Sequence, residues 1–325
     1  MKIHLPTVGG IPHERSAVRD FERLAALRTE PRHQLVADPP EADALLFVEC
    51  HQLNDPITMS RVRRTAEFRE FRDKSFVFDQ RPRSYCSLPG LYTSVPWRSL
   101  RPQYQIPWSY HWIEDQPSTS ESEPDLLFSF VGTARSHSCR AQIFDLQHPR
   151  ALLHRVDDHV PWQTADPGFN DRKAFFTETL ARSSFVLCPR GRATSSFRFY
   201  EAMAAGRVPV VIADDWIPPF GIDLSEFAVR WPEASVAGLA EYLEGIEPRA
   251  AAMGRRAREV YAERFATNVM FDQVGDALAS LAATRPWSHF PALGFPPDGR
   301  IARHAAGRAR KLADVARRRV RSLRA

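Results

Sequence analysis

Short apolar runs that alternate with helix-like segments constrain this chain more than any other feature of its sequence. Two largely apolar runs lie in the first half, at Ala44–Cys50 and Ser75–Asp79, and two lie in the second half, at residues 185–188 and Val208–Ile212. Such runs are typical of parallel strands buried on both faces, since a half-exposed strand alternates apolar and polar residues. The alternation predicts an α/β fold with parallel sheets in both halves. Helices are expected at residues 15–28, 61–72 (with Ser60 as the N-cap), 138–146, 171–182, 197–205, 237–243, 253–265 and 268–283.

The length of the chain and one polar stretch indicate two domains. A chain of 325 residues is longer than one ordinary domain. Residues 114–125 (EDQPSTSESEPD) are acidic and rich in Pro and Ser, which is typical of a linker. We therefore predict an N-terminal domain at residues 1–113, a C-terminal domain at residues 126–285, and a Pro-rich connector with a basic helix at residues 286–325.

The positive charge of the chain is concentrated at its C-terminal end. Residues 300–325 contain ten Lys and Arg against one acid, whereas the remaining residues contain 34 bases and 38 acids. A slightly acidic body is not typical of a dedicated nucleic-acid-binding protein, so we expect no nucleic-acid partner. The basic helix at residues 301–323 suits an anionic membrane surface or a solvated tail, and it is a candidate for a closing helix that crosses back to the first domain.

The sequence lacks the patterns of a membrane or secreted protein. No stretch of about 18 apolar residues occurs, and the first residues contain no apolar core of a secretory signal. The four cysteines show no CxxC spacing, which is typical of reduced thiols in a reducing compartment. We therefore expect a cytoplasmic protein whose only membrane contact, at the inner face, is made by residues 301–323.

The segment richest in chemistry, residues 185–220, is predicted to form a strand, a loop, a helix and a second strand. In open α/β sheets ligands bind beyond the carboxyl ends of the strands, so the loop after Pro189 lies where an anion would bind. Backbone N–H groups and the dipole of the following helix favour a phosphate there. Arg190, Arg192 and Arg198 add guanidinium groups whose geometry suits a pyrophosphate.

The helix after this loop adds further polar positions. Ser195 or Ser196 is expected to cap its N-terminus. Glu201 follows Arg198 by one turn on the same face, where its carboxylate can accept hydrogen bonds from both hydroxyls of a ribose. An Arg and a Glu at this spacing also form ordinary surface ion pairs worth under about 0.5 kcal/mol, and the spacing alone does not decide between the two interpretations.

Seven short motifs fill the same segment: Pro189-Arg190-Gly191, Ser196-Phe197-Arg198, Glu201-Ala202, Gly206, Pro209-Val210, Asp215-Trp216 and Pro219-Phe220. Together they resemble the signature of the exostosin-like glycosyltransferases, glycosyltransferase family 47. The resemblance implies the GT-B fold, in which two Rossmann-like domains with parallel sheets face each other across a cleft. The first domain would bind the acceptor and the second the donor. It also implies transfer of a sugar from a nucleotide donor, usually UDP-linked, with inversion and without a metal.

The donor site predicted from the loop and from the resemblance contains six residues: Arg140, Arg190, Ser195, Ser196, Arg198 and Glu201. Arg140 comes from residues 128–140, which resemble the strand and the following Arg that open the donor domain of the family. No Asp-x-Asp triplet and no HExxH motif occur, so we predict no metal site. The GxGxxG and P-loop motifs are absent as well, and no cofactor other than the sugar donor is expected.

Inversion requires a base that takes the proton of the acceptor hydroxyl. The candidates near predicted strand ends of the first domain are Asp79, Glu49, His51 and His13. Asp79 is favoured because it ends a buried strand and matches an acid-ending strand in the family, although a turn-capping Asp would look the same. We assign catalysis to Asp79 and to Arg198, which would stabilise the leaving diphosphate.

These assignments predict an enzyme that moves a sugar from a nucleotide donor, UDP-linked as the family resemblance implies, to a hydroxyl of a glycan or lipid-linked acceptor. Two alternatives stay open. A non-catalytic protein that binds nucleotide sugars or glycans would keep the donor site and lack the base. An anionic-polymer-binding protein would act through its Arg-rich tail instead.

Overall fold

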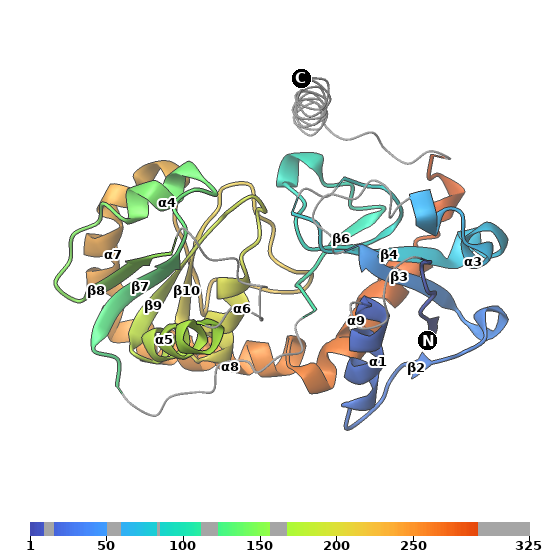
Figure 1. Ribbon diagram of the computed structural model, residues 1–325, viewed down its shortest axis with the longest axis horizontal. Coiled ribbons are helices and arrows are strands. Elements are labelled where there is room, and N and C mark those ends of the chain that lie inside the picture. Colours follow the sequence, from blue (N-terminus) through green and yellow to red (C-terminus); the bar gives the residue numbers. More distant parts are fainter. Residues whose placement is uncertain (10–15, 51–59, 83–84, 112–122, 157–167, 292–325) are drawn as a thin grey trace, which may run out of the picture.

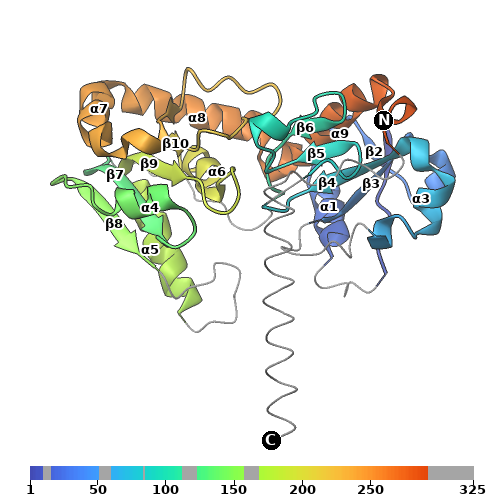
Figure 2. The same cartoon turned by 90° about the horizontal axis from the view of Figure 1, so that it is seen from above.

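The structure, a computed structural model, describes residues 1–9, 16–50, 60–82, 85–111, 123–156 and 168–291. Two α/β domains lie side by side, and each is built on one parallel sheet (Figure 1). The view from above shows the same two bodies, with α8 leading from the C-terminal domain toward α9 in the other (Figure 2). The predicted fold class, α/β with two Rossmann-like domains in the GT-B arrangement, is confirmed.

The N-terminal sheet has the strand order β2-β1-β3-β4-β5-β6, and all its neighbouring strands are parallel. Its strands are β1 (Lys2–His4), β2 (Gln34–Leu35), β3 (Ala44–Cys50), β4 (Ser75–Asp79), β5 (Gly90–Tyr92) and β6 (Gln105–Pro107). Helix α1 (Ala17–Ala26) begins at Ser16, whose hydroxyl accepts the N–H of Val18 at 3.2 Å. Because α1 is the first described helix after β1, its first turn lies at the carboxyl edge of this sheet.

The C-terminal sheet has the order β11-β10-β9-β7-β8 and is also entirely parallel. Its strands are β7 (Leu126–Gly132), β8 (Ala151–Arg155), β9 (Ser183–Pro189), β10 (Val208–Ile212) and β11 (Val229–Arg230). Its helices are α4 (Ser138–Ile143), α5 (Phe169–Ala181), α6 (Phe197–Ala204), α7 (Leu239–Ile246) and α8 (Ala250–Arg264). Alternate residues of β9 face opposite layers: Phe185 packs with α4 and α7, while Val186 packs with α6 and α8.

Helix α9 (Thr267–Ala283) crosses back and packs on the N-terminal domain, against α1, β5 and β6 (Figure 1). Asp272, 3% exposed, fixes it there by accepting hydrogen bonds from Arg28 Nη1 at 3.2 Å and from the backbone N–H of His33 at 3.0 Å. The predicted C-terminal domain, which ended at residue 285, therefore includes a helix that belongs to the other body. Helix α9 thus crosses between the domains, and residues 301–323, the candidate from the sequence, lie outside the described residues.

Most predicted elements match the structure to within a few residues, and one does not. The helix predicted at residues 61–72 is interrupted, and α3 (Ala66–Glu70) restarts after the interruption. Thr65 causes the restart: its hydroxyl donates to Val62 O at 2.9 Å and accepts the N–H of Phe68 at 3.2 Å, which makes it an N-cap. The predicted cap at Ser60 is therefore wrong for α3.

Several predictions lie outside the described residues. They concern residues 114–122 of the linker, 292–300 of the connector, the helix at residues 301–323 and its membrane contact, and the side chains of His13, Glu49 and His51. In the part of the chain that the structure describes, no helix has the length and apolar character needed to cross a membrane.

Candidate functional site

The order of the C-terminal strands places a ligand site between β7 and β9. These strands are neighbours, yet the chain after β7 returns to β8 on one side, and the chain after β9 continues to β10 on the other side. Ligands of open parallel sheets bind at such a topological switch point, beyond the carboxyl ends of the strands. The loop that follows β9, residues 190–196, borders this position, as predicted.

Two arginines brace this switch point reciprocally. Arg140, on the helix after β7, donates from Nε to Arg190 O at 2.9 Å and from Nη2 to Pro189 O at 3.0 Å, at the end of β9. Arg198, on the helix after β9, donates from Nε to Val131 O at 3.0 Å, near the end of β7, and its Nη2 donates to the same carbonyl. The guanidinium that follows β7 thus binds the backbone at the end of β9, and the guanidinium that follows β9 binds the backbone of β7.

The braces place two positive charges in a buried setting. Burial and, to a smaller extent, the nearby charge of Arg198 lower the pKa of Arg140 to about 9. Burial also lowers the pKa of Arg198, although Glu201 opposes this change. No ion pair of either arginine is found among the described residues. A bound anion would stabilise this arrangement, since uncompensated like charges are costly in a medium of low dielectric constant.

Buried hydroxyls beside the braces also lack partners. Ser196 is the N-cap residue of α6, but its hydroxyl does not cap the helix. In the described part of the chain, no hydrogen-bond partner is found for the hydroxyls of Ser136, Thr194 and Ser196 or for Arg190 Nε. A buried polar group without a partner costs about 1–3 kcal/mol, so this cluster is typical of a site that a ligand completes. The same atoms are shielded from solvent, so the loop must open for a ligand to reach them.

Arg190 faces two carboxylates. Its Nη1 atom lies 3.7 Å from Asp215 Oδ2 and 3.6 Å from Glu233 Oε1, and its side chain is 18% exposed. His137 joins the group, with Nε2 at 3.6 Å from Glu233 Oε2, and burial followed by the charge of Arg190 lowers its pKa. The sequence did not reveal Glu233 or His137 as site residues. Asp215 was present in the Asp215-Trp216 motif, which was the only signal for this group.

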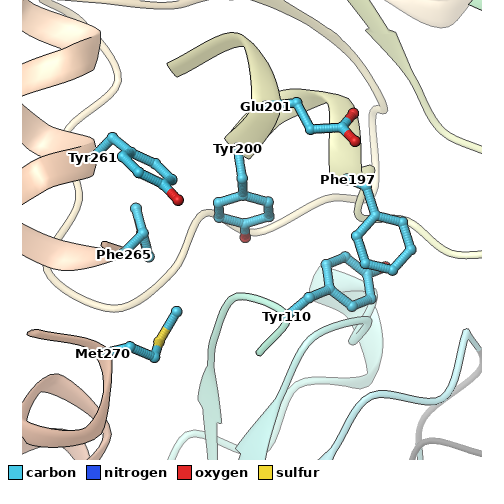
Figure 3. A pocket seen from close by; sticks show the side chains of 7 residues that line it. All are labelled: Tyr110, Phe197, Tyr200, Glu201, Tyr261, Phe265 and Met270. Atoms are coloured by element: carbon cyan, nitrogen blue, oxygen red, sulfur yellow. The ribbon is translucent and has the colours of Figure 1, made fainter. Parts of the chain in front are cut away.

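Glu201 lies at the junction of the two domains, where it lines a cavity of about 20 Å³, room for one water molecule. Burial raises the pKa of Glu201, and the charge of Arg198 opposes the rise. The aromatic and sulfur-containing side chains that share the cavity lie around it in Figure 3: Tyr110, Phe197, Tyr200, Tyr261, Phe265 and Met270. The cavity is too small for a nucleotide, so a ribose would have to reach Glu201 from the switch-point side.

The N-terminal domain touches the loops of this site directly. The ring of Tyr110 stacks on that of Phe197, with centroids 3.9 Å apart (Figure 3). Its hydroxyl donates to Ser195 O at 3.5 Å, and Ser195 is 4% exposed. The backbone N–H of Trp97 donates to Asp215 O at 3.0 Å. Residues of the first domain therefore border the switch point of the second.

The structure brings the six predicted donor residues together at the switch point. The predicted base Asp79 is not an open carboxylate. Asp79 is 0% exposed. Arg81 Nε lies 2.9 Å from Asp79 Oδ1 and 3.1 Å from Oδ2, Arg81 Nη2 also donates to Oδ2, and the backbone N–H of Arg81 donates to Oδ1 at 3.0 Å. This is a buried structural ion pair, and such a carboxylate does not fit the role of a base for an incoming acceptor.

No group of three or more His, Cys, Asp or Glu side chains placed to bind a metal occurs within the described ranges. The three cysteines whose side chains the structure describes are buried and free, and burial raises the pKa of Cys86 to about 12 and of Cys139 to about 11. Thiols of this kind stay protonated and are not nucleophiles.

Comparison with known proteins connects this region with a family. Residues 89–246 match the family model of the exostosin GT47 domain. The chain is 43% identical over 89 residues to the exostosin-1 homolog of Caenorhabditis elegans, which covers 26% of this chain and 23% of that protein. It is 42% identical over 57 residues to exostosin-1 of Drosophila melanogaster, which covers 18% of this chain and 7% of that protein. The chain thus spans less than a quarter of the length of these relatives, and the resemblance predicted from residues 185–220 is confirmed.

Solved structures share the architecture only loosely. The structure of HepE from Anabaena in complex with UDP is 14% identical, with a TM-score of 0.45 over 86% of this chain and 100% of that chain. The structure of MurG from Acinetobacter baumannii is 10% identical, with a TM-score of 0.37 over 85% of this chain and 99% of that chain. The fold assignment therefore rests on the strand order of the two parallel sheets.

Proposed function

We propose, on the premise that residues 89–246 form an exostosin GT47 domain, that this chain is an inverting, metal-independent glycosyltransferase. It moves a sugar from a nucleotide donor, UDP-linked as the family resemblance implies, to a hydroxyl of a glycan or lipid-linked acceptor. The observation that carries the proposal is the pair of buried arginines, Arg140 and Arg198, which brace the switch point without an ion-pair partner among the described residues.

The reaction is a single displacement at the anomeric carbon. The acceptor oxygen forms the new glycosidic bond while the bond from that carbon to the diphosphate oxygen breaks, and UDP leaves with the electron pair. Negative charge grows on the diphosphate, next to the guanidiniums of Arg140 and Arg198 and the N-terminus of α6. Donors already oriented in this way typically contribute about 3 kcal/mol each to the stability of a transition state.

The remaining groups of the site have separate roles in this proposal. The hydroxyls of Ser196 and Thr194, which lack partners in the described part of the chain, donate to phosphate oxygens once the loop opens. Glu201 accepts hydrogen bonds from the ribose hydroxyls. Arg190 lies between the diphosphate and the carboxylates of Asp215 and Glu233, so it links the phosphate site to the acids at the ends of β10 and β11.

Titration with UDP tests the donor site. A ligand present at 100 times its Kd stabilises a protein by about 2.7 kcal/mol, so UDP should raise the melting temperature by several degrees. Uridine, which has the base and ribose but no phosphate, should bind far more weakly. The proposal is refuted if UDP gives no shift, or if UDP and uridine give the same shift.

Turnover separates an enzyme from a non-catalytic binding protein. UDP-glucose, UDP-galactose, UDP-N-acetylglucosamine and UDP-glucuronate should be screened for slow hydrolysis, in which water replaces the acceptor. Release of UDP from at least one donor is the expected result. Binding of UDP without turnover of any donor would favour the non-catalytic alternative instead.

A further inference from the structure

The loop after β10 carries a carboxylate beside the switch point of the C-terminal sheet. In the strand order β11-β10-β9-β7-β8, the switch point lies between β9 and β7, and β10 is the next strand on one side. Asp215 follows β10 in the chain, and Glu233 follows β11. Neighbouring strands lie about 4.8 Å apart, so a ligand whose diphosphate occupies the switch point can reach the end of β10 with its next group. Asp215 therefore lies where one end of a bound nucleotide sugar would lie.

The carboxylate of Asp215 has charged neighbours but accepts no hydrogen bond from the residues that the structure describes. Arg190 Nη1 lies 3.7 Å from Oδ2, and Arg98 Nε lies 3.9 Å from Oδ1. Both distances exceed the range of about 2.7–3.2 Å for an N–H···O hydrogen bond. By comparison, the surface pair of Arg150 and Glu247 has hydrogen bonds of 2.7 and 2.6 Å. Since the side chain of Asp215 is only 23% exposed, water reaches it poorly, and a ligand that supplies hydrogen-bond donors would stabilise it.

Glu233 differs from Asp215 because its hydrogen bonds are made within the protein. Its Oε1 atom accepts the backbone N–H of Asp214 at 2.9 Å, and its own N–H donates to Asp214 Oδ1 at 3.1 Å. On the other side of Asp215, the buried Trp216 has its carbonyl bound by Arg230 Nη2 at 3.1 Å. Both chain neighbours of Asp215 are thus fixed, which preorganises its carboxylate for a ligand.

The N-terminal domain borders the same carboxylate. The backbone N–H of Trp97 donates to Asp215 O at 3.0 Å, and the ring of Trp97 is 56% exposed. In the function proposed above, the acceptor lies on the N-terminal domain and the diphosphate on the C-terminal domain. The sugar that moves must lie between them, which is where Asp215 lies, whereas Glu201 serves the ribose at the other end of the diphosphate.

We propose that Asp215 accepts hydrogen bonds from hydroxyls of the transferred sugar, so that this sugar is neutral and not a uronic acid; this inference rests on the function proposed above. Sugar hydroxyls are the hydrogen-bond donors that the carboxylate lacks. A uronate would bring a third carboxylate next to those of Asp215 and Glu233, and like charges at close range repel. Arg190 offsets little of this repulsion because the diphosphate engages it, and Arg98 offsets little because its side chain is 66% exposed.

Asp215→Asn tests the assignment through binding. The amide keeps the size of the side chain, but it removes the charge and replaces one acceptor oxygen by an NH₂ group. Because a hydrogen bond to a charged group contributes about 10- to 100-fold to affinity, the Kd of the best neutral UDP-sugar should rise at least about tenfold. The Kd of UDP should not rise, since UDP has no sugar and the variant removes no positive charge. Titration calorimetry measures both affinities.

The preference among sugar donors gives a second readout. UDP-glucose, UDP-galactose, UDP-N-acetylglucosamine and UDP-glucuronate are compared by kcat/KM for hydrolysis. The wild type should use glucuronate at least about tenfold less well than the best neutral sugar, and Asp215→Asn should reduce this ratio about tenfold because the repulsion is lost.

Asp223→Asn is the matched control. It makes the same change of charge at an exposed position on the same connection between β10 and β11. The asparagine oxygen can still accept the N–H of Ser225, which Asp223 Oδ1 accepts at 2.9 Å. This variant should therefore keep the affinities and the sugar preference of the wild type.

The outcomes separate this inference from the proposed function. A wild type that prefers UDP-glucuronate would overturn the inference, as would an Asp215→Asn variant that binds the neutral UDP-sugar as tightly as the wild type or loses UDP and UDP-sugar equally. A wild type that neither binds UDP nor turns over any donor would refute the proposed function, and this inference with it. Weaker binding of the neutral UDP-sugar alone, together with a smaller preference against glucuronate, supports both.

Discussion

The two sheets differ in whether the charged side chains at their carboxyl edges have a partner of opposite charge. In the C-terminal domain, Arg140 and Arg198 donate to backbone carbonyls and have no carboxylate partner among the described residues. In the N-terminal domain the buried carboxylate of Asp79 pairs with Arg81 of the same domain. One edge therefore has positive charge left for an incoming anion, and the other does not.

The difference agrees with the chemistry of the two proposed substrates. A UDP-sugar brings negative charge that must be balanced, whereas an acceptor hydroxyl is neutral and needs only a group that removes its proton. The comparison teaches that a buried charged group indicates a ligand only when its own domain does not already neutralise it.

The largest effect on stability is expected at the carboxyl edge of the N-terminal sheet, where Asp79 pairs with Arg81. Asp79→Ala removes the buried carboxylate that binds the guanidinium of Arg81, which should lower the free energy of unfolding by about 3–5 kcal/mol. Urea denaturation measures this change. Glu247→Ala is a suitable control, because it breaks an exposed pair with Arg150 and should cost at most about 1 kcal/mol. A stable Asp79→Ala variant that had lost only turnover would contradict this structural role and would support Asp79 as the base.

The next largest effect, on UDP affinity, is expected at the carboxyl edge of the C-terminal sheet. Arg198→Met should weaken UDP binding about 10- to 100-fold, since a hydrogen bond to a charged group contributes about 1.5–3 kcal/mol. Titration calorimetry measures the affinity. Arg192→Met serves as the control, because Arg192 is exposed on the same loop and should bind UDP normally. Equal losses in the two variants would mean that the buried brace has no special role.

A smaller effect follows from the raised pKa of Glu201. The folded protein holds a proton on this carboxyl at pH values where the unfolded chain has released it, so its contribution to stability falls as pH rises above the ordinary value of 4.5. Ribose hydroxyls donate to the charged form, and UDP binding should therefore release up to about one proton at pH values just above the ordinary glutamate value of 4.5. Calorimetry in buffers of different ionisation enthalpy measures this release. Glu201→Gln should abolish it, and proton uptake by the wild type would contradict the assignment.

The smallest effect is expected from metal removal. Arginines and N–H groups supply the positive potential in this account, so EDTA should leave both UDP binding and donor hydrolysis unchanged. Assays with and without the chelator, followed by addition of Mn²⁺ or Mg²⁺, check this expectation. Loss of turnover with EDTA that either ion restores would contradict metal independence.

The sequence predicted what depends on local pattern. Strands β3, β4 and β10 have the predicted bounds, because continuous apolar runs between breaker residues define a buried strand. Gly206, one of the motif residues, follows the C-cap of α6 with a φ of 69°, a conformation that favours glycine. The loop motifs placed the donor residues around the switch point, since a loop between a strand and a helix can only lie at the carboxyl edge.

What depends on long-range packing was not predictable. Arg140 and Arg198 brace each other's strands only because β7 lies next to β9, an order that the sequence of elements does not specify. The apolar face of α9 does not reveal which domain it covers.

The central claim, that a diphosphate completes the switch point between β7 and β9, is tested most directly by a crystal structure with bound UDP. The account predicts that the two phosphates lie at the N-terminus of α6, within hydrogen-bond distance of Ser196 or Thr194 and beside the guanidiniums of Arg140 and Arg198. UDP bound elsewhere, with this loop still closed and these hydroxyls still without a partner, would contradict it.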